Sequence, residues 1–224
     1  MPAILNKIFL YGSLFIGVVP MGIALYNYFF LKQQHKWVLY KIVFHLLIVC
    51  VSVFVRFKGP NFFLYYILCF GLAITIHFIF VRYYNRSIVR TVARLSTVLY
   101  LLFLLLDAFV LSGTNTYKNS SFTLFDFWAI TVIIIYLGQT LKNTHIRRLR
   151  DYPMFWISIG IAIPYLASLL HFLLSSSALI INIKLFFVTE NMSLMGNIAG
   201  SVLQAIGFWK CRKTAIDETL FKKI

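Results

Sequence analysis

The stretch LYLLFLLLDAFVLS, residues 99–112, decides the fold class of this chain. Its leucines and phenylalanines surround a single carboxylate, Asp107. A run this apolar is typical of a helix that crosses a membrane, and a carboxylate inside such a run is costly unless it has polar partners. The stretch therefore predicts a membrane helix, and it predicts polar groups elsewhere in the chain that accompany Asp107.

The composition of the whole chain extends this prediction. Of its 224 residues, 61% are hydrophobic and only 12% are charged, and its mean hydropathy is +0.85. Soluble domains have about 45–50% apolar and about 25% charged residues. The formal net charge is +15, but the basic residues fall in short clusters between apolar runs, which indicates membrane topology rather than a nucleic-acid-binding face. We expect an all-α, multi-pass protein of the cell membrane, specifically a bacterial inner membrane, that binds no nucleic acid.

Seven apolar runs have the roughly 20 residues that a helix needs to cross about 30 Å of hydrocarbon. These runs cover residues 8–30, 37–56, 61–81, 92–112, 123–141, 154–174 and 192–209. We expect one seven-helix bundle over residues 1–209 and a short basic cytoplasmic tail over 210–224. The segment 175–191 carries Lys184 and Glu190, so we expect it to form a surface helix on the outer side instead of an eighth span.

The distribution of lysine and arginine predicts the orientation of the bundle. Sixteen of the 21 basic residues fall on one side of the expected spans and five on the other, alternating loop by loop. The positive-inside rule then places the C-terminus in the cytoplasm and the N-terminus outside. Trp37, Trp156 and Trp209 fall at the inner interface and Trp128 at the outer one, as in an aromatic belt.

Polar residues recur on one face of three of the expected helices. These stripes are Lys41, His45 and Ser52; Ser96, Tyr100 and Asp107; and Asn197, Ser201 and Gln204. Lipid offers no hydrogen-bond partners, so each stripe is expected to face the interior of the bundle.

The expected depths of these groups suggest a ligand-binding pocket that opens toward the outer side. We expect it to be formed by polar residues near the outer ends of the helices together with one nearer the midplane: Arg56, Asp107, Asp126, His171, Asn197 and His45. Arg56 or a protonated histidine is the candidate partner that neutralises Asp107. Two alternatives stay open: Asp107 is held by a structural pairing alone, and His45 makes a plain hydrogen bond between helices.

Prolines and glycines add to this expectation. Pro20 and Pro164 each remove a helix hydrogen bond, which predicts kinks that free carbonyl groups. Gly196 and Gly200 form a G-x-x-x-G pattern that Gly207 extends. Such a face favours close helix packing within the chain over dimerisation.

Two arginine clusters lie on the predicted inner side. They are Arg82, Arg86, Arg90 and Arg94, and then Arg147, Arg148 and Arg150. The first cluster is interleaved with polar residues at the membrane boundary, which favours contact with anionic lipid headgroups. A docking surface for a cytoplasmic signalling partner is the alternative.

Motifs of enzymes and cofactor sites do not occur in the sequence. It has no H-E-x-x-H, G-x-S-x-G, C-x-x-C or phosphate-binding loop. We therefore expect no catalytic residues, no metal site and no cofactor. The three cysteines, Cys50, Cys69 and Cys211, are expected to pack as small apolar residues.

The segments DYPMFWISIGIAIPYLASLLHFLLS (residues 151–175) and NIAGSVLQAIGFWKCRK (residues 197–213) resemble the last two helices of uncharacterised bacterial seven-helix membrane proteins. Similar bundles serve as membrane input domains of some sensor histidine kinases. The resemblance implies a seven-helix bundle that senses a ligand. Only fifteen residues follow Trp209, so we expect a free-standing sensor or accessory bundle without a fused effector. A small secondary carrier is the second hypothesis, and an intramembrane hydrolase using His45, His171 and Asp107 is the third.

Overall fold

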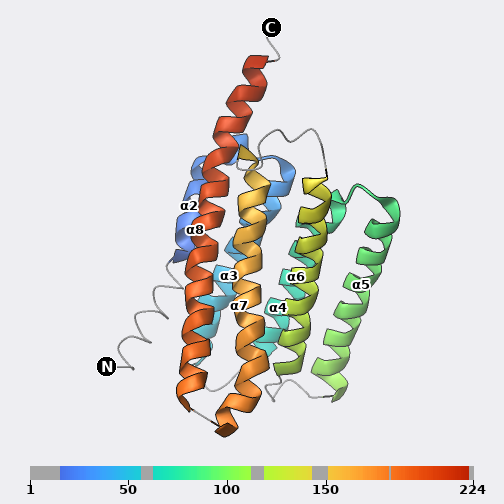
Figure 1. The fold of residues 1–224 in the computed structure, drawn as a ribbon, viewed down its shortest axis with the longest axis vertical. Helices are drawn as coiled ribbons and strands as arrows, with labels where there is room; N and C mark the ends of the chain where they lie inside the picture. Colours follow the sequence, from blue (N-terminus) through green and yellow to red (C-terminus); the bar gives the residue numbers. More distant parts are fainter. Residues whose placement is uncertain (1–15, 57–62, 112–118, 143–150, 182, 222–224) are drawn as a thin grey trace.

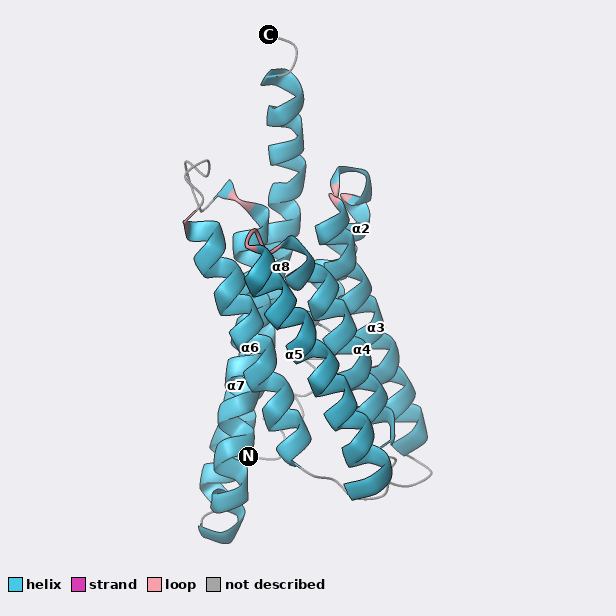
Figure 2. Ribbon diagram, turned by 90° about the vertical axis from the view of Figure 1, so that its right-hand side faces the viewer, coloured by secondary structure: helices cyan, strands magenta, loops and turns pink. Residues whose placement is uncertain are grey.

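The computed structural model describes residues 16–56, 63–111, 119–142, 151–181 and 183–221, and this part of the chain consists of helices joined by short connections, without strands (Figure 1, Figure 2). Its seven α-helices are α2 (Val18–Tyr26), α3 (Gln33–Arg56), α4 (Phe63–Ile79), α5 (Ser87–Leu106), α6 (Asn119–Leu141), α7 (Pro153–Ile181) and α8 (Ile183–Phe221). Three single turns complete it: the 3-10 turns η1 (Tyr28–Phe30) and η2 (Val81–Tyr83), and the π-helical turn η3 (Asp107–Leu111).

Within the described residues, five helices are long and apolar enough to cross a membrane. These candidate spans cover Gln33–Val51, Phe63–Tyr83, Ser87–Val110, Ser121–Leu141 and Pro153–Leu174. They coincide with the second to sixth predicted spans, so the expectation of an all-α, multi-pass membrane protein is confirmed. The described part of the first predicted span is the nine-residue α2 and the turn η1. The last predicted span lies inside the 39-residue α8.

Successive helices run in alternating directions, so each loop lies at one of the two ends of the bundle (Figure 1). The upper end in Figure 1 carries the turns η1 and η2, the start of α7 and the end of α8. Lys32, Arg82, Arg86, Lys142 and Lys210 belong to this end, which we call the basic end. The clustering of positive charge that the sequence predicts is therefore a property of one end of the folded bundle.

Helices α7 and α8 form the most extensive helix pair, and α2 packs against α8 (Figure 1). Glycines allow this close approach. A Cβ on Gly200 would lie 2.5 Å from the carbonyl oxygen of Gly160 and 2.5 Å from Cγ of Pro164, and a Cβ on Gly207 would lie 2.5 Å from Cγ1 of Ile157. The prediction that the glycine face serves packing within the chain is confirmed.

Two expectations need correction. The segment 175–191 is not a separate surface helix: α7 continues to Ile181 and α8 starts at Ile183. Residues 175–181, SSSALII, contain no proline or glycine that would end α7 at the predicted boundary. Trp128 is not an interface anchor, because its side chain is only 8% exposed, stacks on Tyr100 and donates a hydrogen bond to Ser96 at 3.2 Å.

Candidate functional site

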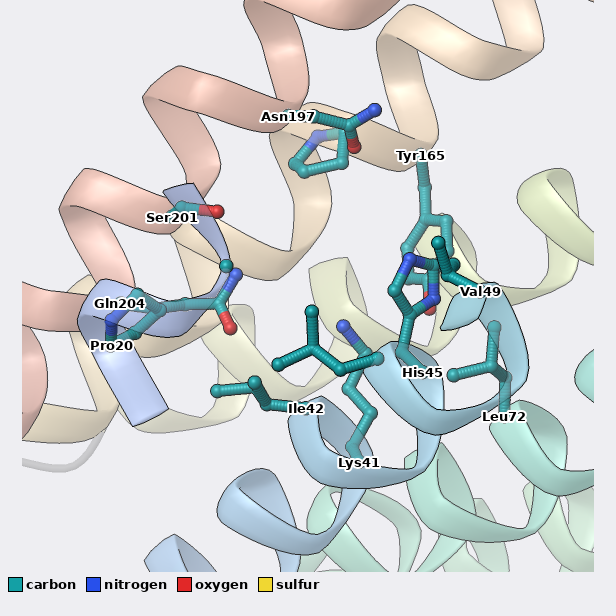
Figure 3. Close-up of a pocket in the computed structure, with 13 residues that line it drawn as sticks. Pro20, Lys41, Ile42, His45, Val49, Leu72, Tyr165, Asn197, Ser201 and Gln204 are labelled. Carbon is teal, nitrogen blue, oxygen red and sulfur yellow. The ribbon is translucent and has the colours of Figure 1, made fainter. Parts of the chain in front are cut away.

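A cavity of about 190 Å³ lies between α2, α3, α4, α7 and α8 (Figure 3). We call it the central cavity. Its polar lining consists of Lys41, His45, Tyr165, Asn197, Ser201 and Gln204. Apolar side chains, among them Ile42, Val49 and Leu72, form the remaining walls. This mixture of an apolar wall and a few convergent polar groups is typical of a ligand site.

The cavity joins two of the polar stripes that the sequence predicts. Lys41 and His45 are one turn apart on α3, and Asn197, Ser201 and Gln204 follow one face of α8 (Figure 3). Lipid cannot satisfy these groups, so α3 and α8 turn them toward each other. The prediction that these two stripes face inward is confirmed for Gln204, which is buried, and for Lys41, Asn197 and Ser201, which are half-buried at the cavity. His45 lines the cavity but is exposed, and the side chain of Ser52 lies outside the described part of the chain.

Both prolines of the predicted kinks line the central cavity. Pro20 lies in the first turn of α2, where a missing N–H costs little, so it does not break a helix there. Pro164 lies inside α7 and cannot donate to the carbonyl of Gly160, four residues earlier. Gln204 supplies the missing donor, with its Nε2 3.0 Å from the Gly160 oxygen. One wall of the cavity is therefore built around a proline-freed carbonyl.

Positive charge dominates the lining. The Nζ of Lys41 lies 5.5 Å from the centre of the Tyr165 ring, a cation–π contact. The described lining contains no carboxylate. A ligand with an acidic group would therefore find a cation, an imidazole and two amides in the same space (Figure 3).

Asp126 lies behind this lining and not in it. Its side chain is 3% exposed and its Oδ2 is buried without a hydrogen-bond partner among the described residues. Ser168 and Tyr165, both on α7, are electrostatic neighbours of the carboxyl group. Because Tyr165 also lines the central cavity, it links Asp126 to the site.

Asp107 has partners of its own, away from the central cavity. It is 2% exposed and accepts a hydrogen bond from Tyr66 of α4 at 3.2 Å and another from Ser121 of α6. The side chain of Arg56, its predicted partner, lies outside the described residues. These contacts are those of the structural pairing that the sequence left open as the alternative.

His171 is likewise held elsewhere. Its Nδ1 lies 3.1 Å from the hydroxyl of Thr189, a contact between α7 and α8. Of the six residues predicted to form a pocket, the structure brings His45 and Asn197 together, places Asp126 behind them and gives Asp107 and His171 separate partners.

The site also contains residues that the predicted set omits. Lys41, Ser201 and Gln204 belong to the predicted stripes, and their helical spacing was the signal that could have added them. Tyr165 carries no such signal, because an aromatic residue after Pro164 reads as an ordinary apolar position. Its place depends on how α7 packs against α3.

The arginines of the basic end do not act alike. Arg82, Arg86 and Arg94 are exposed, whereas Arg90 is half-buried and donates hydrogen bonds from Nε, at 3.0 Å, and from its terminal nitrogen to the carbonyl oxygen of Tyr84. Arg90 thus helps to fix the turn before α5. Arg147, Arg148 and Arg150 lie outside the described residues.

Among the described residues, no group of three or more histidine, cysteine, aspartate or glutamate side chains is arranged to hold a metal ion. Comparison of the chain with protein-family models, with curated proteins and with solved structures finds no match.

Proposed function

We propose that this chain is a membrane sensor that binds a small or lipidic ligand through an acidic group in the central cavity. The observation that carries the proposal is the convergence of Lys41, His45 and Asn197 on one cavity whose described lining has no acidic residue. The ammonium of Lys41 offers charge, and the imidazole and the amide offer directed hydrogen bonds. The apolar walls suit a hydrocarbon body attached to that acid.

The position of α8 supports a sensory role. It supplies Asn197, Ser201 and Gln204 to the cavity and continues beyond the other helices at the basic end (Figure 1). At 1.5 Å per residue, its 39 residues span about 58 Å, nearly twice the thickness of the hydrocarbon core. A ligand that shifts α8 in the cavity therefore also shifts a segment that a cytoplasmic partner can contact.

The membrane arrangement that we propose has seven spans, with the C-terminus in the cytoplasm of a bacterial cell and the basic end at anionic headgroups. Its support is the segregation of Lys32, Arg82, Lys142 and Lys210 at one end of the bundle (Figure 1). The resemblance of the last two helices to membrane input domains of histidine kinases is consistent with this arrangement.

The test of ligand binding compares decanoate with decanol, two probes that share an apolar chain and differ in the acidic group. Thermal unfolding of the purified protein in detergent is followed by tryptophan fluorescence. We expect decanoate, and not decanol, to raise the unfolding midpoint, because only a ligand that binds the folded state stabilises it. Lys41→Gln and His45→Gln should lose this response.

Lys36→Gln is the matched control, because Lys36 lies five residues before Lys41 and contacts the ring of Tyr28 at 4.7 Å outside the cavity. Its response should equal that of the unaltered protein. Equal effects of decanoate and decanol, or a full response in Lys41→Gln and His45→Gln, would contradict the proposal.

A second candidate function is a small carrier, and Asp126 favours it. A buried carboxyl with one unpartnered oxygen, next to a cavity residue, is the kind of intramembrane group that relays protons in transporters. Proteoliposome flux of decanoate under a pH gradient that exceeds the flux into protein-free liposomes, and loses this excess in Asp126→Asn, would support a carrier. A sensor binds the same probe without adding to the flux through the lipid. The hydrolase hypothesis gains no support, because His45, His171 and Asp107 have different surroundings.

A further inference from the structure

A second cavity, of about 360 Å³, lies at the basic end and is lined by residues from the first turns of α3 and α7. We call it the basic-end cavity. The first turn of α3 contributes Gln33, Gln34 and His35 to its lining, and the start of α7 contributes Pro153 and Met154. Its volume falls within the roughly 300–1,000 Å³ of small-molecule sites.

The electrostatics of this cavity favour an anion. Two long helices, α3 with 24 residues and α7 with 29, present their N-terminal ends to it. Each such end carries roughly half a positive charge, and helix N-termini bind phosphate and carboxylate groups. Lys32 adds a full positive charge, and the described lining includes no carboxylate. The nearby Asp151 is an ion-pair partner of Lys210, with 3.5 Å between Nζ and Oδ1.

A second, independent observation points to a missing ligand. The side chain of His35 is only 6% exposed, and both of its ring nitrogens are buried without a hydrogen-bond partner in the described part of the chain. The neighbouring Gln34 is, by contrast, bonded to the carbonyl of Ile79 at 2.7 Å and to the hydroxyl of Tyr136 at 3.1 Å. Buried polar groups are normally satisfied, so an orphaned imidazole on a cavity wall indicates that a ligand completes it.

A metal ion is a poor candidate for that ligand. The soft donors in the described lining are the thioether of Met154, which is a weak ligand, and the thiol of Cys211, and their residues are only 1% and 3% exposed. Burial raises the pKa of the Cys211 thiol to about 12, so the group keeps its proton near neutral pH, whereas metals bind the thiolate. Lys32 and the two helix ends would also repel a cation.

We infer that the basic-end cavity binds a phosphate-type anion, to which His35 donates a hydrogen bond, Lys32 supplies charge, the first turn of α3 supplies oriented N–H groups and the start of α7 adds the partial positive charge of its helix dipole. The anion is either the headgroup of an anionic phospholipid or a soluble phosphate ester. This site is distinct from the exposed arginines of the basic end, because its described lining contains no arginine and includes residues from two helix starts. It does not depend on ligand binding in the central cavity.

The experiment uses pairs of probes in which one member carries a phosphate group and the other does not. Thermal unfolding is measured in detergent at constant ionic strength with glycerol 3-phosphate against glycerol, and with phosphatidylglycerol against diacylglycerol. We expect a phosphate-bearing probe to raise the unfolding midpoint above that with its neutral partner. A response to glycerol 3-phosphate identifies a soluble ester, and a response to phosphatidylglycerol alone identifies a lipid headgroup.

Three variants separate the cavity from general surface charge. Lys32→Gln and His35→Leu should abolish the response, and Lys142→Gln, which removes an exposed lysine of the same end, should retain it. Without probe, His35→Leu should unfold at or above the midpoint of the unaltered protein, because it removes an unsatisfied buried polar group. The inference would be overturned if neither phosphate probe raised the unfolding midpoint. It would also be overturned if Lys142→Gln lost the response as fully as the cavity variants, or if Lys32→Gln and His35→Leu both kept it.

Discussion

Gln204 of α8 donates a hydrogen bond of 3.0 Å to the carbonyl oxygen of Gly160 in α7, the oxygen that Pro164 leaves without its helical donor. The proline and the glutamine are forty positions apart in the sequence, and neither predicts the other. Together they let α7 keep a proline in its interior without a buried unsatisfied carbonyl. The same glutamine lines the central cavity, so the packing of α7 on α8 also determines the shape of the site.

This relationship predicts a rescue. Gln204→Leu should lower the free energy of unfolding by about 1–3 kcal/mol, because it leaves a buried carbonyl unpaired. Adding Pro164→Ala restores an N–H within α7 and should recover most of that loss. Unfolding in detergent measures both values. A double variant that is as unstable as Gln204→Leu would contradict this account.

The pairing of Tyr66 with Asp107 makes a second prediction. Tyr66→Phe should lower the free energy of unfolding by about 1–2 kcal/mol, because a hydrogen bond to a buried carboxylate is lost. The loss of unfolding free energy caused by Tyr66→Phe should be smaller in an Asp107→Asn background. A double-mutant cycle measures this difference, which is expected for side chains in contact. Thr131→Val, which removes an exposed hydroxyl bonded within its own helix, is the control. Equal losses in the two backgrounds would show that the pair is not coupled.

The glycine face makes a third prediction, with a control in the same chain. Gly200→Ala should destabilise the bundle by about 1–3 kcal/mol, because its Cβ would meet Gly160 and Pro164 at 2.5 Å and force α7 and α8 apart. Gly138→Ala should be neutral or stabilising, because no atom lies within 4 Å of its added Cβ and alanine is the better helix former. Thermal unfolding measures the midpoints of the two variants. Equal midpoints would contradict the prediction.

Arg90 is expected to differ from its neighbours in the arginine series. Arg90→Ala should reduce stability by about 1–2 kcal/mol, because it removes the donors to the Tyr84 carbonyl at the turn before α5. The same turn is held to α6 by the Tyr84 hydroxyl, 2.6 Å from the carbonyl oxygen of Val132. Arg86→Ala removes an equal charge from an exposed position and should leave the unfolding midpoint unchanged. Equal changes in stability from Arg90→Ala and Arg86→Ala would show that the hydrogen bonds of Arg90 do not stabilise the turn.

The proposed orientation predicts the compartment of the C-terminal end. A fluorescent protein fused after residue 224 should fluoresce in the bacterial cytoplasm, and alkaline phosphatase fused at the same place should stay inactive, because it folds only after export. The reason is the excess of basic residues at the end of the bundle where α8 finishes. Active alkaline phosphatase at this position would show that the orientation is the opposite of the one proposed.

The sequence by itself determined the helical class, five of the spans and the inward direction of two polar stripes. Each of these depends on local composition or on a period of 3.6 residues, which one segment carries without its neighbours. Lys41 and His45 show this well, because their spacing alone places them on one face, and lipid leaves that face only the interior of the bundle.

Only the tertiary structure decided which polar groups meet. Asp107, Asp126 and His171 have similar predicted depths, yet depth along a helix does not specify rotation or which helices are neighbours. The packing of α5 against α4 and α6 brings Asp107 into hydrogen-bonding contact with Tyr66 and Ser121. The packing of α7 on α8 does the same for His171 and Thr189. The basic-end cavity likewise depends on the starts of α3 and α7 reaching the same space, although Gln34 and Pro153 are 119 positions apart in the sequence. Contacts of that range arise from the arrangement of whole helices, and no single segment encodes them.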